Sequence, residues 1–161
     1  MLPPAEPNPE VMDPGLHQND DNLSDLDRDF QAVGPALRIL QLNVEGLSAA
    51  KRGVISSIAE RQKVDIICLQ ETHVNEDKAG RFSIAGFDLV SYALHPKHGR
   101  AMYVRCDITE AAHVVSTPHC DAVRVGGFHI ANIYKPPSER WDSSNPIPTF
   151  PHPAVLVGDF N

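Results

Sequence analysis

The chain has little of what stabilises a secreted scaffold or a membrane protein. Its three cysteines, Cys68, Cys106 and Cys120, show no CxxC spacing, which excludes a disulfide framework and favours a reducing compartment. No apolar run approaches the length of a membrane span, and the first residues lack the basic and apolar segments of a signal peptide. The sequence therefore predicts an intracellular protein of the nucleus or cytoplasm, not secreted and with no membrane partner.

Basic residues are scarce in one part of the chain only. Residues 1–36 hold eight acidic residues and a single base, Arg28, whereas acids and bases balance in the remainder of the 161-residue chain. The first segment is also rich in proline, and it is too polar to bury much surface. We therefore predict a disordered acidic tail over 1–36 and one domain over 37–161, whose neutral charge neither requires nor excludes nucleic acid.

The acidic tail contains three apolar residues at helical spacing, Leu23, Leu26 and Phe30. They are consistent with a short helix that docks on a partner. The alternative is a solvated tail with incidental apolar residues, and acidic-apolar alternation alone favours this second interpretation.

Alternating and helical patterns predict an α/β domain. A strand over 37–43, an apolar helical stripe over 47–59 and a strand over 64–70 are typical of a right-handed βαβ crossover with parallel strands. Gly126-Gly127 predicts a hairpin turn, and six prolines between Pro136 and Pro153 exclude a helix there. Further strands are predicted over 87–93, 101–105, 113–116, 122–125, 128–134 and 154–157.

Polar residues follow the predicted strands where their carboxyl ends share an edge of the sheet. Asn43 and Glu45 follow the first strand, Glu71 follows the second, and Asp159 and Asn161 end an apolar strand at Gly-Asp-Phe-Asn. Such edges bind ligands in parallel sheets. These oxygen donors suit Mg²⁺ or Mn²⁺ better than zinc.

Each of these residues has a structural alternative. A single Glu or Asn after a strand is more often a turn or cap residue, and Tyr134 alone is more often a packing residue. The pairs His95/His98 and His119/Cys120 are read as surface polar residues, because zinc needs more ligands than either pair supplies. The combination at one edge is what favours a functional site.

Four segments together resemble the endonuclease/exonuclease/phosphatase superfamily, which is DNase I-like. They are Leu42 to Leu47 (LNVEGL), Asp65 to Thr72 (DIICLQET), Asn132 to Pro136 (NIYKP) and Val157 to Asn161 (VGDFN). The nearest resemblance is to the apurinic-type endonuclease domain of non-LTR retrotransposons, with which the stretch Gly99 to Val104 (GRAMYV) is also similar.

The resemblance implies a four-layer α/β sandwich with mixed sheets and metal-dependent hydrolysis of phosphate esters. It implies Mg²⁺, or Mn²⁺, held mainly by Glu71 with Glu45 nearby. Asn43 would bind the metal shell or the phosphate, and Tyr134 the phosphate or leaving oxygen. Asp159 would align and deprotonate the attacking water, and Asn161 would orient Asp159 or bind the phosphate. Double-stranded DNA is the implied partner.

The sequence departs from the family pattern at its end. The Gly-Asp-x-Asn motif lies near the middle of the family domain, so we expect a C-terminally truncated domain without the family's later strands and Asp–His pair. Three functions follow as alternatives. They are a DNA-nicking endonuclease of a non-LTR retrotransposon, an inert truncated or degenerate copy, and the same fold acting on inositol phosphate, sphingolipid or RNA.

Overall fold

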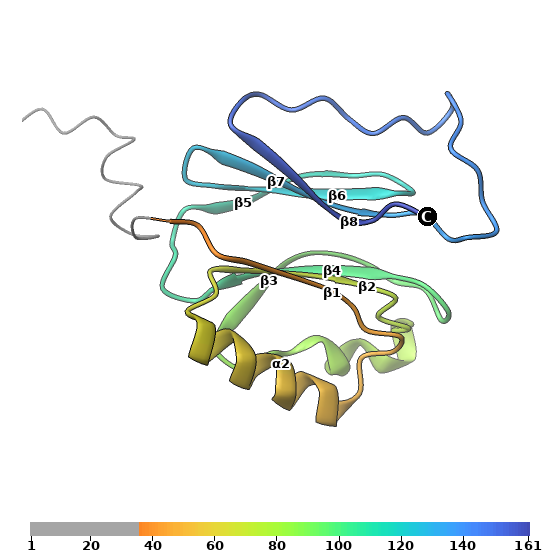
Figure 1. Cartoon of the computed structure of the whole chain (residues 1–161). Coiled ribbons are helices and arrows are strands. Elements are labelled where there is room, and N and C mark those ends of the chain that lie inside the picture. Colours follow the sequence, from red (N-terminus) through yellow and green to blue (C-terminus); the bar gives the residue numbers. More distant parts are fainter. Residues whose placement is uncertain (1–35) are drawn as a thin grey trace, which may run out of the picture.

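Two four-stranded sheets lie face to face, with the helices on the outer side of the first sheet (Figure 1). The computed structural model describes residues 36–161. The predictions for the acidic tail, including Leu23, Leu26 and Phe30, fall outside the described residues. None of the helices within 36–161 is long and apolar enough to cross a membrane.

The first sheet confirms the predicted crossover. Strands β1 (Ile39–Asn43) and β2 (Ile66–Gln70) are parallel and are joined by helix α2 (Ala49–Gln62). Strands β3 (Phe87–Ala93) and β4 (Arg100–Arg105) complete the order β1-β2-β4-β3 by antiparallel pairing. The Ser48 hydroxyl accepts a hydrogen bond from the Lys51 N–H at 3.2 Å and caps α2, which places the helix start at Ala49.

The second sheet is mixed as well. Its strands are β5 (Ala111–Ser116), β6 (Cys120–Val125), β7 (Phe128–Tyr134) and β8 (Ala154–Asp159). The predicted hairpin between β6 and β7 is confirmed, and β8 joins β7 in parallel after the proline-rich loop. Strand β8 runs two residues beyond the predicted 154–157 because its pairing with β7 continues as far as Tyr134 and Asp159.

One element was absent from the sequence prediction. A kinked 3₁₀ helix, η1 (Glu76–Phe82), follows β2 and buries Phe82. It carries too few apolar residues to produce a helical period, since only Phe82 of its seven residues is buried. Most other strand boundaries differ from the prediction by one or two residues, which is where hydrogen-bond partners rather than local pattern decide.

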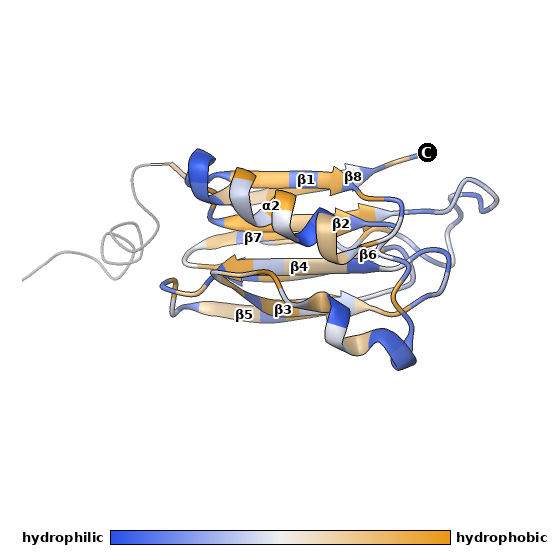
Figure 2. Cartoon of the chain, turned by 90° about the horizontal axis from the view of Figure 1, so that it is seen from below, coloured by the Kyte–Doolittle hydropathy of each residue, from blue (hydrophilic) through white to orange (hydrophobic). Residues whose placement is uncertain are grey.

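Three apolar clusters stack through the molecule, and Figure 2 shows the hydrophobic residues concentrated in the strands. The first lies between α2 and the first sheet and includes Leu47 and Ile55. The second lies between the sheets, around Met102 and Ile130. The third lies on the outer face of the second sheet, where Ile147 and Phe150 of the proline-rich loop cover it. The sandwich with mixed sheets is confirmed, but within 36–161 a loop forms its fourth layer instead of helices.

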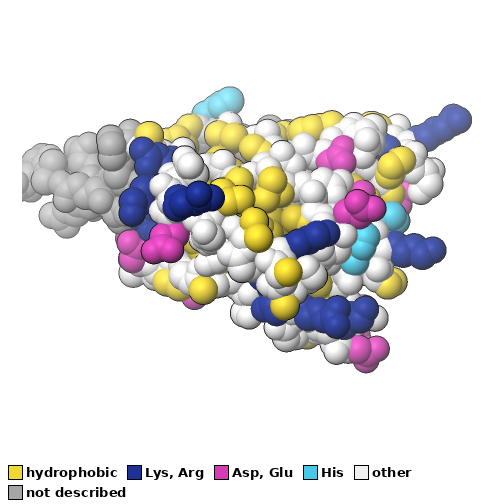
Figure 3. Space-filling view, turned by 60° about the horizontal axis from the view of Figure 1, so that its bottom comes forward, with side chains coloured by type: hydrophobic (Ala, Val, Ile, Leu, Met, Phe, Trp, Pro, Cys, Tyr) yellow, Lys and Arg dark blue, Asp and Glu magenta, His cyan; other side chains and the backbone are white. Residues whose placement is uncertain are grey.

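An apolar groove of about 340 Å³ remains open between α2 and the edge strand β1. Leu42, Val54 and Ile58 are among its lining residues, and Val54 is 58% exposed. Figure 3 shows apolar side chains gathered between groups of Lys and Arg on the face that carries the helices. Lys51 at the rim donates to the carbonyls of Val44 and Glu45, at 2.6 and 2.9 Å, and so stabilises the turn that follows β1.

Candidate active site at the junction of the two sheets

The site lies where both sheets end on the same side of the sandwich. Strands β1 and β2 are parallel, and so are β7 and β8, so each pair brings two carboxyl ends together. Two side-chain hydrogen bonds cross between the sheets there, one from Asn43 to Asp159 and one from Tyr134 to Glu71. The predicted gathering of these four residues at one edge is therefore confirmed.

Asn43 orients the carboxylate of Asp159. Its Nδ2 donates to Asp159 Oδ2 at 3.1 Å, and its own Oδ1 accepts the N–H of Glu45 at 3.3 Å. The second carboxylate oxygen, Asp159 Oδ1, accepts the N–H of Asn161 at 3.4 Å. Each oxygen of Asp159 thus accepts one hydrogen bond, and the carboxylate keeps further lone pairs that can accept a proton or a hydrogen bond from water. Asn161 acts on Asp159 through its backbone N–H.

Tyr134 lies between Glu71 and His98. Its hydroxyl donates to Glu71 Oε1 at 3.0 Å, and His98 Nδ1 lies 3.1 Å from the same hydroxyl. A tyrosine hydroxyl has one proton, so if that proton goes to the carboxylate, His98 must donate from Nδ1–H. Tyr134 is 1% exposed, and burial, followed by the hydrogen bond to Glu71, raises the pKa of its hydroxyl.

The backbone beside the carboxylates adopts an unusual conformation. Glu45, Glu71 and His73 have φ of 44°, 53° and 53°, in the left-handed region that non-glycine residues rarely occupy. Backbone hydrogen bonds hold two of these turns, from the Gly46 N–H to the Glu71 carbonyl at 2.7 Å and from the His73 N–H to the His98 carbonyl at 2.8 Å. Such conformations cost on the order of 1 kcal/mol each and concentrate at functional sites.

Gly158 explains the first residue of the Gly-Asp-Phe-Asn motif. Its φ is 143°, and a Cβ atom there would lie 1.9 Å from the carbonyl oxygen of Ile133 on the paired strand. No side chain fits in that space. The glycine lets β8 approach β7 closely enough to bring Asp159 level with Tyr134.

A network of hydrogen-bonded side-chain amides lies between the two sheets, next to the site residues. Gln41 Nε2 donates to Gln70 Oε1 at 2.5 Å, Gln70 Nε2 donates to Asn132 Oδ1 at 2.5 Å, and Asn132 Nδ2 donates to the Leu69 carbonyl at 3.0 Å. Gln70 and Asn132 are fully buried, so this network links the interiors of the two sheets. No role for Gln41, Gln70 or Asn132 is predicted from the sequence. Their positions in the sequence could have indicated a role, since Gln70 directly precedes Glu71, and Asn132 lies two residues before Tyr134 and so on the same face of the strand.

His98, predicted to be a surface polar residue, contacts the site instead. Besides its bond to Tyr134, its ring stacks on His95 with centroids 4.6 Å apart. Burial and then the neighbouring His98 lower the pKa of His95. His73 Nε2 lies 3.8 Å from Glu71 Oε2, so one histidine borders the carboxylate and His98 borders the tyrosine bonded to it. Neither could be placed there from sequence, because both depend on how the loops fold over the sheet edge.

The oxygen donors suit a hard cation in kind, but they do not form a closed cage. The side chain of Glu71 is 22% exposed, and its Oε2 lies 3.8 Å from His73 Nε2. Glu45, predicted as the second acid, is exposed on the turn after β1. No three His, Cys, Asp or Glu residues within 36–161 are grouped closely enough to hold a metal ion.

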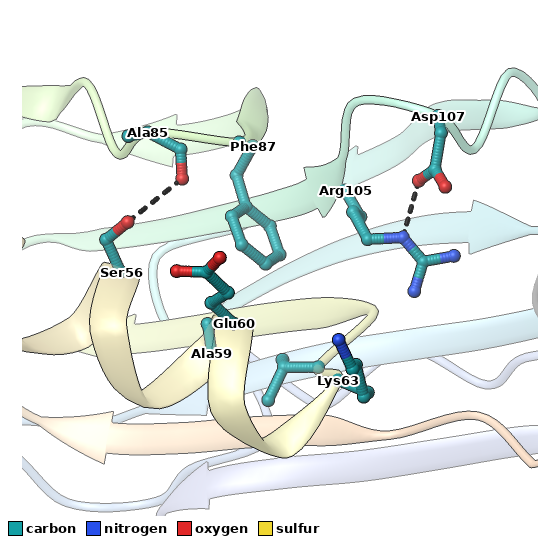
Figure 4. A pocket seen from close by; sticks show the side chains of 10 residues that line it. Ser56, Ala59, Glu60, Lys63, Ala85, Phe87, Arg105 and Asp107 are labelled. Atoms are coloured by element: carbon teal, nitrogen blue, oxygen red, sulfur yellow. Dashed lines mark hydrogen bonds and ion pairs between the residues drawn. The ribbon is translucent and has the colours of Figure 1, made fainter.

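A separate concavity of about 560 Å³ lies at the other end of the first sheet. Figure 4 shows Phe87, Lys63, Glu60 and Arg105 around it, with charges of both signs. Arg105 ends β4, which pairs there with the start of β2, the end opposite to Glu71. Ion pairs with Asp65 and Asp107 engage the Arg105 guanidinium. None of the predicted site residues lines this concavity.

Several solved structures are similar to the chain. An AP endonuclease from Archaeoglobus fulgidus is 20% identical with a TM-score of 0.48, and the match covers 62% of this chain and 41% of that one. A 3′ phosphatase, NExo from Neisseria bound to a product DNA hairpin, is 22% identical with a TM-score of 0.48 and the same coverage. The chain thus spans about two fifths of the length of these structures. Likeness at this level indicates nothing about activity.

The sequence itself decides the family. No curated protein matches the chain. The sequence profile of the Endonuclease/Exonuclease/phosphatase family matches residues 40–161, which is most of the chain and all of the site. The chain therefore belongs to the Endonuclease/Exonuclease/phosphatase family.

Proposed function

We propose that the protein is a Mg²⁺-dependent phosphodiester hydrolase that nicks double-stranded DNA. The observation that carries the proposal is the pair of hydrogen bonds that joins Asn43 to Asp159 and Tyr134 to Glu71 across the two sheets. They fix two carboxylates at one edge, and Glu71 remains partly accessible. Hydrolysis of a phosphate ester needs one group that prepares water and another that neutralises charge.

The residues divide these tasks by their surroundings. Asp159, held by Asn43 and by the Asn161 N–H, is placed to orient water and take up its proton. Glu71, with Glu45 as a neighbouring acid, would hold Mg²⁺, with Mn²⁺ as a substitute. A bound divalent ion would offset the negative charge of the phosphate. The Tyr134 hydroxyl, which donates to Glu71 in the free chain, would redirect its proton to a phosphate or leaving oxygen when substrate binds.

The test is nicking of supercoiled plasmid by the full chain with Mg²⁺. We expect Glu71→Gln and Asp159→Asn each to reduce the rate by about a hundredfold or more. Asp77→Asn, at an exposed acid of η1, is the matched control and should leave the rate unchanged. Nicking that survives both site substitutions would refute this site. Preference for an inositol phosphate, a sphingolipid or RNA over duplex DNA would replace the proposed substrate.

A second candidate function is a non-catalytic product of the same fold. One observation favours it. The described residues contain no group of three metal-binding side chains. A folded chain that binds duplex DNA in a filter-binding assay, but hydrolyses no phosphate ester with Mg²⁺ or Mn²⁺, would establish this function.

We further propose that the protein is encoded by a non-LTR retrotransposon and acts inside the cell. The support is the resemblance of Gly99 to Val104 and of the four motifs to such endonucleases. The test is to read the transcript beyond the codon for Asn161. An open frame that encodes further strands and a reverse transcriptase supports this origin, and a genomic copy without any adjoining element sequence contradicts it.

A further inference from the structure

Trp141, in the proline-rich loop, is held beside the site by contacts on several sides. Its ring meets the His119 ring edge-on, with centroids 5.4 Å apart, and the Lys135 ammonium lies 5.8 Å from its centroid. Its indole Nε1–H donates to the Phe160 carbonyl at 3.4 Å. The indole is thus fixed in orientation, which is not expected of an aromatic side chain that merely projects from a loop.

The groups behind the indole are themselves anchored. Lys135 is 3% exposed, and its Nζ donates to the carbonyls of Pro136 at 3.0 Å and Glu139 at 2.7 Å. His119 is 5% exposed, and its Nε2 lies 2.5 Å from Glu139 Oε2. The buried cation and imidazole therefore form a rigid support for Trp141.

The supported indole remains accessible and lies next to the reacting groups. Trp141 is 39% exposed and Phe160 is 49% exposed. Phe160 stands between Asp159 and Asn161, so the hydrogen bond to its carbonyl places the indole one residue from the proposed base. Trp141 and Phe160, whose backbone carbonyl accepts the indole N–H, each leave an aromatic side chain exposed near Asp159, whereas large apolar side chains on a protein surface are normally scattered singly.

We propose that Trp141, with Phe160 beside it, is a stacking platform for an unpaired nucleobase next to the scissile phosphate. An aromatic ring held in one position beside a phosphate site suits a nucleotide, because the planar base of a nucleotide lies a short distance from its phosphate. Inositol phosphates and sphingolipid headgroups have no planar aromatic ring to stack. The proposal rests on the proposed function and narrows its substrate to polynucleotides that present an unstacked base at the cleavage position.

The chain provides its own probe, because Trp141 is its one tryptophan. Indole fluorescence of the full chain is titrated with single-stranded oligothymidylate and with an abasic oligomer of equal length, which has the same phosphates but no bases. Stacking predicts that oligothymidylate quenches the fluorescence and the abasic oligomer does not. Equal quenching by the two ligands would overturn the proposal, since the phosphates alone would then explain it.

A variant checks the affinity by a second measurement. For Trp141→Ala we expect anisotropy of labelled oligothymidylate to show binding weakened roughly 5- to 100-fold, with binding of the abasic oligomer unchanged. The matched control is Val54→Ala, an exposed apolar residue of α2, which should bind both ligands like the parent. Equal weakening of both ligands by Trp141→Ala would overturn the proposal.

The outcomes for the platform and for the hydrolase separate. Base-dependent quenching in a chain that hydrolyses no phosphate ester supports the platform and refutes the enzyme. Plasmid nicking that depends on Glu71, in a chain whose fluorescence does not respond to oligothymidylate, supports the enzyme and refutes the platform.

Discussion

The Tyr134 hydroxyl, on the second sheet, donates a 3.0 Å hydrogen bond to Glu71 Oε1, which follows a strand of the first sheet. The two residues are 63 positions apart in the chain. Neither sheet alone can form this contact, and the bond from Asn43 to Asp159 also crosses between the sheets. The site therefore exists only when both sheets are folded and packed, so we expect substitutions between the sheets to affect stability and site geometry together.

Tyr134 makes stability depend on pH in the alkaline range. The pKa of the Tyr134 hydroxyl is raised in the folded chain, chiefly by burial and then by Glu71, whereas an unfolded tyrosine titrates near 10. Above about pH 10 the unfolded chain therefore loses the Tyr134 proton while the folded chain keeps it. The stabilisation that is fully present below about pH 10 is lost as the pH rises further, because ionisation favours the unfolded chain. We expect the free energy of unfolding in urea to fall more steeply between pH 9 and 11 for the parent than for Tyr134→Phe. Parallel declines would contradict this, because Tyr103 remains in both proteins.

The bond between Gln70 and Asn132 predicts coupled losses of stability. Asn132→Leu removes the donor to the Leu69 carbonyl and the nearer acceptor of Gln70 Nε2, which then keeps only the Cys68 carbonyl at 3.5 Å. Buried polar groups without partners cost about 1–3 kcal/mol each, so we expect a loss of about 2 kcal/mol or more in urea unfolding. The double variant Gln70→Leu/Asn132→Leu should lose less than the sum of the single losses, by about 1 kcal/mol. Additive losses would show that the two amides do not interact.

Gly158 and Gly53 form a matched pair of glycine-to-alanine changes. At Gly158 a Cβ would meet the Ile133 carbonyl at 1.9 Å and φ is 143°, so Gly158→Ala should lower the free energy of unfolding by about 3 kcal/mol or more. At Gly53, within α2, a Cβ meets nothing within 4 Å, and Gly53→Ala should raise it by about 0.5–1 kcal/mol. Equal effects at the two positions would show that close approach of β7 and β8 is not what requires Gly158.

The cysteines should differ sharply in reactivity. Burial raises the pKa of Cys68 to about 12, and burial followed by Asp121 raises that of Cys120 to about 11. The pKa of Cys106 is raised as well, but its thiol is exposed to the reagent, whereas the other two are buried. Only the thiolate reacts with a disulfide reagent. At pH 8 we expect one thiol of the native chain to react within minutes and all three to react in denaturant. Rapid reaction of more than one thiol in the native chain would indicate that the packing around Cys68 or Cys120 opens easily.

The sequence by itself determined the βαβ unit, the hairpin, and the edge at which Asn43, Glu71, Tyr134 and Asp159 collect. Each followed from a local rule, namely strand alternation, a helical stripe, a glycine turn or the shared carboxyl ends of parallel strands. It did not predict η1, whose few apolar residues produce no period. It also predicted Glu45 as a second acid near Glu71; this stays a prediction, and the turn after β1 leaves Glu45 exposed.

Only the tertiary structure decided which atoms meet. The hydrogen bond from Tyr134 to Glu71, the amide network of Gln70 and Asn132, and the placement of His98 beside Tyr134 join segments that lie 36 to 63 residues apart. Such contacts depend on how two twisted sheets pack and how the loops at their ends are held, and no local pattern encodes those relations. Trp141 was likewise only a loop residue in the sequence, until His119, Lys135 and Phe160 were brought around it.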